Sequence, residues 1–151
     1  LSRANTLSMV QITQTTADGE RLREIQRAAL PEPWPELLDA ALNGFPPLFV
    51  ASEDRPVGYA IVMPGPEETA YLTELAVDPD EQRNGYGSEL LDAVWQAQKR
   101  EGYERLALTV RVVDEGARAF YQRHGFEQEE RLDDEYDSGA GLLLVRDLTE
   151  L

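Results

Sequence analysis

Apolar positions recur along the chain with two spacings, and the change from one to the other predicts its elements. Alternation favours a strand, whereas apolar residues three and four apart favour a helix. Val10–Thr15 alternates and predicts a first strand. A helix is expected from Asp18 until Pro31 stops it, and a second short helix ends near Asn43 and Gly44.

The middle of the chain predicts a hairpin followed by a crossover. Two strands, Leu48–Ala51 and Val57–Val62, are joined by a turn-rich segment, which is typical of a hairpin. Tyr71–Val77 is a mostly apolar strand, and from Tyr86 onward the spacing becomes that of a long amphipathic helix. The strand Leu106–Val110 follows, so this part of the chain predicts a parallel βαβ unit.

The last third predicts one more helix and two strands. The helix runs from about Glu115 to His124, and the strands cover Phe126–Leu132 and Leu142–Leu148 around an acidic connection that contains glycine. The complete order is β-α-α-β-β-β-α-β-α-β-β. It predicts a mixed α/β (α+β) sheet of about seven strands flanked by four helices.

No repeat or linker divides the chain, and its 151 residues suit one domain with a core rather than two ordinary domains. We therefore expect a single domain over residues 9–151. Leu1–Ser8 is interpreted as a flexible leader, with Met9 as a candidate native start. The leader lacks a signal pattern and the longest apolar runs are strand-sized, so we expect a cytoplasmic protein with no membrane partner.

The charge is strongly negative, with a formal net charge of −15 at pH 7. This disfavours binding to the phosphate backbone of nucleic acid, so no nucleic-acid partner is expected. Lys99 is the only lysine. An acidic surplus with so little lysine indicates a halophilic surface, adapted to concentrated salt that screens self-repulsion. An ordinary acidic mesophilic protein is the alternative.

The absence of cysteine and the single histidine exclude several kinds of chemistry. Without cysteine there are no disulfides, thiolate nucleophiles or zinc–sulfur sites. His124 alone makes a multi-histidine metal site or a Ser-His-Asp triad a poor hypothesis, and no metal is expected. Its position just before Gly125 favours a role at a helix C-terminus over catalysis.

The segment between the strand ending at Val77 and the long helix predicts a diphosphate site. At the start of a helix, unpaired N–H groups and the positive end of the dipole converge. Two glycines one residue apart let backbone nitrogens approach a phosphate, and an arginine adds a cation. The predicted contacts are Gln82, Arg83, Asn84, Gly85, Tyr86, Gly87 and Ser88.

The residues of this loop do not fit two other phosphate-binding motifs. A Walker-type site requires lysine and Ser/Thr after the second glycine, whereas Ser88 and Glu89 follow here. A dinucleotide fingerprint requires a third glycine where Leu90 stands, and only the late Asp114 could supply its acid. A glycine-rich helix start without any ligand stays open, because short glycine patterns are weak signals.

A second motif follows the next strand, and the two together carry a resemblance to a known family. The pattern Gln/Arg-x-x-Gly-x-Gly/Ala is met by Gln82, Gly85 and Gly87. The downstream pattern Asn-x-x-Ala-x-x-Phe/Leu-Tyr-x-x-x-Gly-Phe is met at Ala117, Phe120, Tyr121, Gly125 and Phe126. In order and with a strand between them, these motifs resemble the GNAT superfamily of N-acetyltransferases.

The resemblance implies an acyl-CoA N-acyltransferase-like fold and transfer of an acetyl group from acetyl-CoA, the co-substrate, to a primary amine. Main-chain groups of Leu75, Ala76 and Val77 would bind pantetheine and polarise the carbonyl. The second motif would add Asp114, Ala117 and Phe120 to the cofactor contacts. Asp114 departs from the family, which usually has asparagine there. It remains a good helix N-cap but places a negative charge near the pantetheine path.

Two residues are candidates for catalysis. By resemblance Tyr121 lies near the thioester sulfur and is the acid for the departing thiolate; the alternative is a buried aromatic that packs a helix on the sheet. Glu74 is the candidate base, acting directly or through water, because burial in an apolar strand would raise the pKa of its carboxyl. The alternative is a solvent-facing strand residue.

The acceptor amine is left open between a small molecule, a lysine and a protein N-terminus. Trp34, Phe45 and the acidic run Asp133–Asp137 lie in the segments that shape the acceptor site in relatives, although such a run is usually a solvated surface. A non-catalytic acyl-CoA-binding or sensor domain and a nucleotide-binding domain are the alternatives. Many family members dimerise, so a homodimer is compatible with the resemblance.

Overall fold

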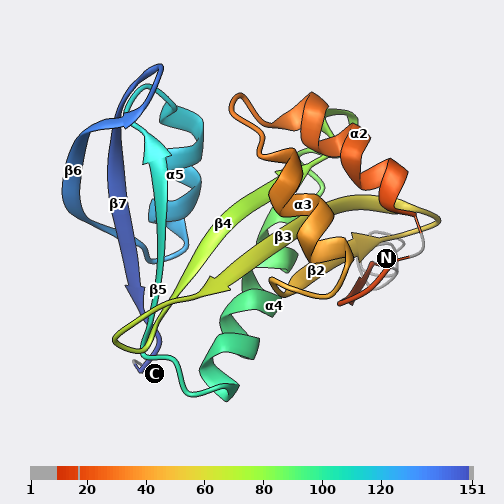
Figure 1. The fold of residues 1–151 in the computed structure, drawn as a ribbon, viewed down its shortest axis with the longest axis horizontal. Coiled ribbons are helices and arrows are strands. Elements are labelled where there is room, and N and C mark those ends of the chain that lie inside the picture. The colour runs from red at the N-terminus through yellow and green to blue at the C-terminus, as the bar shows by residue number, and fades with distance from the viewer. Residues whose placement is uncertain (1–9, 17, 150–151) are drawn as a thin grey trace, which may run out of the picture. The chain divides into compact units, whose positions relative to one another are not determined.

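The computed structural model describes residues 10–16 and 18–149, which form seven strands, four α-helices and one short 3-10 helix (Figure 1). The strands lie in one sheet in the order β1-β2-β3-β4-β5-β7-β6, which confirms the predicted fold class. The predicted leader, 1–8, lies outside the described residues. The elements are β1 (Gln11–Thr13), α2 (Gly19–Ala29), α3 (Pro35–Leu42), β2 (Leu48–Ser52), β3 (Pro56–Pro64), β4 (Thr69–Val77), η1 (Pro79–Glu81), α4 (Tyr86–Arg100), β5 (Arg105–Arg111), α5 (Glu115–Arg123), β6 (Glu127–Tyr136) and β7 (Gly139–Asp147).

The pairing of the strands confirms both supersecondary predictions. β2 and β3 are antiparallel and form the hairpin. β4 and β5 are parallel, with α4 between them in the chain, as a βαβ unit requires. Three further pairs, β1 with β2, β5 with β7 and β7 with β6, are antiparallel. No helix in the described part of the chain is both long and apolar enough to cross a membrane.

Contacts divide the described chain into two compact units. The first contains the residues up to Met63 together with Glu74–Ala97, and the second contains Pro64–Thr73 and the residues from Gln98 onward. β4 and α4 therefore each contribute residues to both units. That the chain is one domain stays a prediction.

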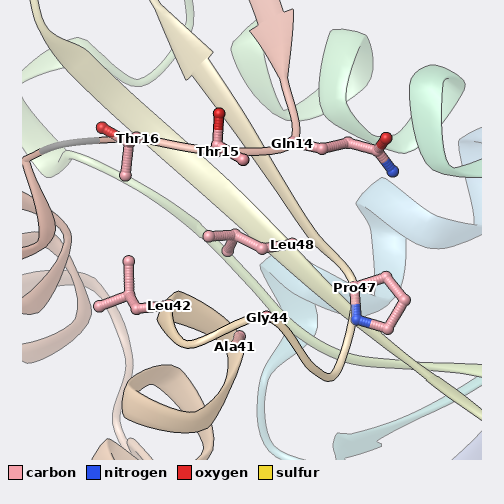
Figure 2. Close-up of a pocket in the computed structure, with 8 residues that line it drawn as sticks. All are labelled: Gln14, Thr15, Thr16, Ala41, Leu42, Gly44, Pro47 and Leu48. Atoms are coloured by element: carbon pink, nitrogen blue, oxygen red, sulfur yellow. The ribbon is translucent and has the colours of Figure 1, made fainter.

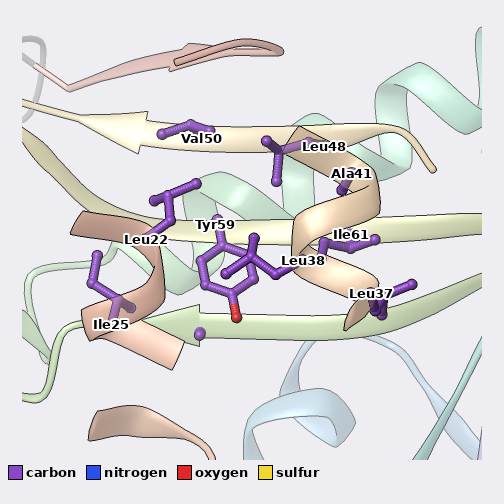
Figure 3. Packing of buried hydrophobic residues seen from close by; sticks show 10 residues of the cluster. Leu22, Ile25, Leu37, Leu38, Ala41, Leu48, Val50, Tyr59 and Ile61 are labelled. Atoms are coloured by element: carbon purple, nitrogen blue, oxygen red, sulfur yellow. The ribbon is translucent and has the colours of Figure 1, made fainter. Parts of the chain in front are cut away.

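The core of the first unit is formed where α2 and α3 cover β2 and β3 (Figure 3). The helix α2 starts where it was predicted, because the Asp18 carboxylate accepts a hydrogen bond of 3.2 Å from the Arg21 N–H. Its apolar face then points at the strands. The cluster comprises Leu22, Ile25, Leu37, Leu38, Ala41, Leu48, Val50, Tyr59, Ile61 and Ala76.

β3 is buried on both faces, and Gly58 permits this. Residues 57–62 are all buried, and successive side chains of a strand point to opposite faces. Tyr59 and Ile61 contact the α2–α3 side. At Gly58, a Cβ atom would lie 2.8 Å from the Ala76 carbonyl oxygen and 3.2 Å from a Leu90 methyl of α4. The glycine therefore allows α4 to approach the strand.

Gly58→Ala is expected to lower the free energy of unfolding by about 1–3 kcal/mol, because the added methyl meets a backbone oxygen that cannot move alone. Chemical denaturation would measure the change. Gly116→Ala is the matched control, since the nearest atom to its added Cβ is 3.9 Å away and alanine favours the helix α5. An equal loss in both variants would contradict this explanation.

The second unit is built on β5, which pairs with β7 over Arg105–Arg111. β4 pairs with β5 only from Thr69 to Tyr71, within the residues that the structure describes. One prediction here was wrong. Most of the acidic run Asp133–Asp137 belongs to a strand, because β6 continues to Tyr136 and β7 begins at Gly139, which leaves only Asp137 of the run in the connection. β6 is an edge strand, so its carboxylates reach solvent and do not oppose strand formation.

Candidate active site

The predicted site residues are distributed over the two units. The first unit contains Glu74, the strand end Leu75–Val77 and the loop Gln82–Ser88. The second contains Tyr121 and the residues of the second motif: Asp114, Ala117 and Phe120.

The backbone of the loop before α4 is compatible with the predicted diphosphate site. After η1, Arg83 has φ 73° and Gly85 has φ 85°, and α4 begins at Tyr86. A Cβ atom at Gly85 would meet nothing within 4 Å, so open space lies beside this backbone. The first helical hydrogen bond runs from the Glu89 N–H to the Gly85 carbonyl at 3.0 Å. The amides before Glu89 therefore lie at the positive end of the 15-residue helix, which suits an anion.

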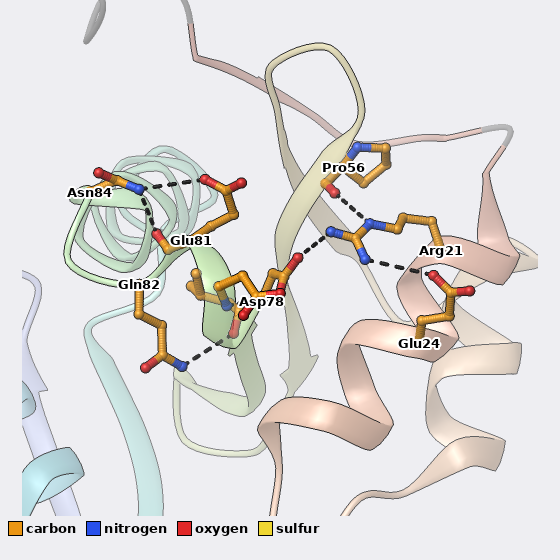
Figure 4. Close-up of polar contacts among 9 residues, drawn as sticks. Arg21, Glu24, Pro56, Asp78, Glu81, Gln82 and Asn84 are labelled. Carbon is orange, nitrogen blue, oxygen red and sulfur yellow. Dashed lines mark hydrogen bonds and ion pairs between the residues drawn. The ribbon is translucent and has the colours of Figure 1, made fainter.

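Two amide side chains of the loop donate hydrogen bonds to nearby backbone carbonyls (Figure 4). The Gln82 amide donates to the Val77 carbonyl at 3.3 Å, and the Asn84 amide donates to the Glu81 carbonyl at 3.0 Å. These donors are used for the chain's own backbone. Gln82, Arg83 and Gly85 are exposed, whereas the Tyr86 ring is buried. Arg83 is therefore the side chain that best supplies positive charge to the loop.

The end of β4 presents alternate residues to its two edges. Along a strand, the N–H and C=O groups of successive residues point to opposite sides. The Ala76 carbonyl lies against Gly58, and the Asp78 N–H donates to the Val57 carbonyl at 2.8 Å, so both face β3. The main-chain groups of Leu75 and Val77 consequently point away from β3.

Glu74 is a buried carboxylate held by three donors, and its side chain does not face solvent. Only 8% of the residue is exposed. Oε1 accepts hydrogen bonds from the Tyr59 hydroxyl at 2.8 Å and from the Gln26 amide at 2.9 Å. Oε2 accepts one from the Trp34 backbone N–H at 2.9 Å. A carboxylate has about four acceptor positions, so one position on Oε2 is left for a proton or a water.

Burial is the largest influence on this carboxyl and raises its pKa, while the bonds from Gln26, Tyr59 and Trp34 act in the opposite direction. Sequence reasoning missed Gln26 and Tyr59 as partners. A signal for Gln26 existed, because it follows Leu22 and Ile25 on the apolar face of α2, where a polar residue needs a buried partner. Nothing in the sequence singled out Tyr59 for its hydroxyl.

Tyr121 is buried on α5 in the second unit. Its ring contacts Phe120 and Phe126 edge-on, with centroids 5.1 and 5.6 Å away. Within the described part of the chain, its hydroxyl makes no hydrogen bond. Burial raises the pKa of this phenol well above its ordinary value, and the charges of Asp114 and Tyr136 add to the effect. Tyr121 thus stays protonated over the working pH range and has a proton to donate.

The ends of α5 are capped as predicted. The Asp114 carboxylate accepts a hydrogen bond of 3.1 Å from the Ala117 N–H, so the residue that departs from the family pattern still begins the helix. His124 is the C-cap, and its Nδ1 lies 2.8 Å from the Phe120 carbonyl oxygen. The Arg146 guanidinium donates to the His124 carbonyl at 2.8 Å. His124 therefore belongs to the helix end.

Two other features of the first unit contact solvent. A pocket of about 340 Å³ lies between the residues after β1 and the turn from α3 to β2 (Figure 2). Among the described residues, its lining contains none of the predicted catalytic or cofactor residues. Trp34 and Phe45 are 54% and 58% exposed.

No group of three or more His, Asp or Glu side chains in the described ranges could hold a metal ion.

Comparison with known proteins gives consistent matches. Residues 19–126 match the model of the acetyltransferase (GNAT) family. A ribosomal protein bS18 alanine N-acetyltransferase from Salmonella typhimurium is 32% identical over 126 residues, which is 82% of each chain. The crystal structure of Ard1 from Thermoplasma volcanium superposes with a TM-score of 0.86 at 25% identity, over 94% of this chain and 99% of that one. An acetyl-CoA-bound acetyltransferase from Elizabethkingia anophelis gives a TM-score of 0.80 at 22% identity, over 92% and 98%.

Proposed function

Because the chain belongs to the GNAT family of acetyltransferases, we propose that it transfers the acetyl group of acetyl-CoA to the α-amine at a protein N-terminus. The observation that carries the proposal is the relative from Salmonella typhimurium, an alanine N-acetyltransferase of a ribosomal protein that matches 82% of this chain. The diphosphate of acetyl-CoA is the natural ligand of the amides between Gly85 and Glu89, with Arg83 as the cation.

In the proposed reaction, the neutral amine attacks the thioester carbonyl carbon, and a new C–N bond forms. The tetrahedral intermediate collapses with cleavage of the C–S bond, and the thiolate takes the proton of the Tyr121 hydroxyl. Main-chain N–H groups of Leu75 and Val77 are the proposed donors to the oxyanion. After the attack the nitrogen carries a positive charge, and it loses a proton to the free acceptor position of Glu74, directly or through water.

The choice of an α-amine is supported by its acidity. An α-amino group titrates near ~7.7–8.0, whereas a lysine side chain titrates near ~10.4. At neutral pH a useful fraction of N-termini is therefore already the neutral nucleophile. An amine that is already partly neutral needs little help from a base. Glu74 suits this limited role, because most of its acceptor positions are already occupied by Tyr59, Gln26 and Trp34.

A peptide panel tests this proposal. Peptides with a free N-terminal alanine are compared with the same sequences carrying a blocked N-terminus and an internal lysine, with acetyl-CoA present, and products are identified by mass spectrometry. We expect acetylation at the α-amine of the free peptides. Acetylation of only the lysines, or only of small-molecule amines included in the panel, would overturn the assignment of the acceptor.

A further inference from the structure

The loop that carries the proposed diphosphate site is attached at both ends to the same structure, the end of the β2–β3 hairpin. We define the hairpin end as residues 53–57, from Glu53 to Val57. The loop segment runs from Asp78, directly after β4, to Tyr86, the first residue of α4. Both belong to the first unit.

Asp78 attaches the start of the loop. Its backbone N–H donates to the Val57 carbonyl at 2.8 Å, and its carboxylate forms an ion pair with Arg21 of α2. The Arg21 Nε in turn donates to the Pro56 carbonyl at 3.0 Å (Figure 4). Asp78 and Arg21 have side chains that are only 11% exposed, so water competes little for this pair. Arg21 is thereby used within the protein and is not available to a phosphate.

Tyr86 attaches the end of the loop. Its ring is buried, and its hydroxyl donates to the carboxylate of Glu53. Glu53 is itself held in the turn, because its N–H donates to the Arg55 carbonyl at 3.1 Å. The contact joins residues 33 positions apart, so it does not follow from local helix formation.

We infer that the hairpin end holds the loop in the shape that binds a diphosphate, and that Glu53 acts on Tyr86 as a positioning residue for acetyl-CoA. The inference rests on the proposed function. Between its two attachments the loop contains Arg83 and Gly85 in the left-handed region, a shape that a free chain would adopt only part of the time. Fixing both ends removes that conformational cost from binding, because the amides already converge before the ligand arrives.

The role of Glu53 is specific to one part of the ligand, and this makes it testable. S-acetylpantetheine carries the same thioester as acetyl-CoA but lacks the diphosphate and the nucleotide. If the Glu53–Tyr86 contact positions the loop, its loss weakens the use of acetyl-CoA and leaves the use of S-acetylpantetheine unchanged. If the contact only supports the fold, both donors are affected alike.

The experiment measures kcat/KM for both donors, and the Kd of CoA by calorimetry, in Tyr86→Phe, Glu53→Ala and the double variant. Asp54→Ala is the matched control, because Asp54 is a neighbouring exposed carboxylate of the same turn, whereas the acceptor of the Tyr86 hydroxyl is Glu53. We expect the Kd of CoA to rise about tenfold in each single variant, the size expected for a hydrogen bond to a charged group. The double variant is expected to match the single ones, since the two residues act through one contact.

The outcomes separate the inference from the proposed function. An unchanged Kd of CoA in Tyr86→Phe and Glu53→Ala, or an equal loss with S-acetylpantetheine, would overturn the positioning role while acetyl-CoA binding by the unaltered protein still stands. Failure of the unaltered protein to bind CoA would overturn the proposed function itself. Glu53 is exposed, so its variant preserves the fold even if Tyr86→Phe does not.

Discussion

Tyr121→Phe is expected to lower kcat about a hundredfold or more, the size found for loss of a general acid, with the KM for acetyl-CoA changed less than about twofold. The substitution removes only the hydroxyl. Phenylalanine keeps the edge-on contacts with Phe120 and Phe126, so the packing of α5 is preserved. The expected loss is in transition-state stabilisation, because without the phenol the thiolate leaves unprotonated.

Steady-state kinetics with a fixed peptide acceptor measures this effect, and Tyr103→Phe serves as the control, since Tyr103 is a half-buried tyrosine of the same unit outside the second motif. Because burial raises the pKa of Tyr121, no loss of activity from its ionisation is expected in the ordinary alkaline range. Unchanged turnover in Tyr121→Phe, or an equal fall in Tyr103→Phe, would remove Tyr121 from the mechanism.

Glu74→Gln is expected to lower kcat roughly tenfold to a hundredfold and to flatten the acidic limb of the pH–rate profile. The base is active only when ionised, and burial raises the pKa of Glu74 above its ordinary value of 4.5. Activity of the unaltered enzyme should therefore fall as the pH drops through this raised pKa. Glutamine has no titrating group, so any remaining activity should fall at low pH only through protonation of the acceptor amine.

The same variant should change how stability depends on pH. A carboxyl whose pKa is higher in the folded than in the unfolded state binds its proton more tightly when folded. Its contribution to stability is present below pH 4.5 and is lost as the pH rises through the folded pKa. Denaturation curves of Glu74→Gln should lack this slope, whereas the exposed Asp92→Asn should keep it. An acidic limb of the pH–rate profile that is unaltered in Glu74→Gln would assign proton removal to another group or to bulk water.

Local sequence patterns predicted nearly all of the fold, because the residues that start or stop an element lie at the ends of that element in the sequence. Asp18 and Asp114 cap the helices they precede, and the glycine at Gly85 marks the start of α4. The acidic end of β6 was mistaken for a connection. Runs of carboxylates are typical of loops, and only the position of this strand at the edge of the sheet makes them tolerable.

The long-range contacts of the site were not predictable in the same way. Arg21 and Asp78 are 57 positions apart, and Gln26 and Glu74 are 48 apart. No local spacing brings such residues together; the pairing of the strands and the packing of α2 do so. Sequence could name Glu74 as a buried acid, but which groups donate to it depends on the tertiary fold.

The acidic side chains of β6 also bear on how two copies of the protein could associate. An edge strand offers unpaired backbone groups to which another strand can add. Here a second copy docking along that edge would bring the exposed carboxylates of Glu127, Glu130 and Asp134 towards an identical row, and like charges repel at such separations. We expect this border of the sheet to keep copies apart in dilute buffer, so that a homodimer, if one forms, joins through another surface.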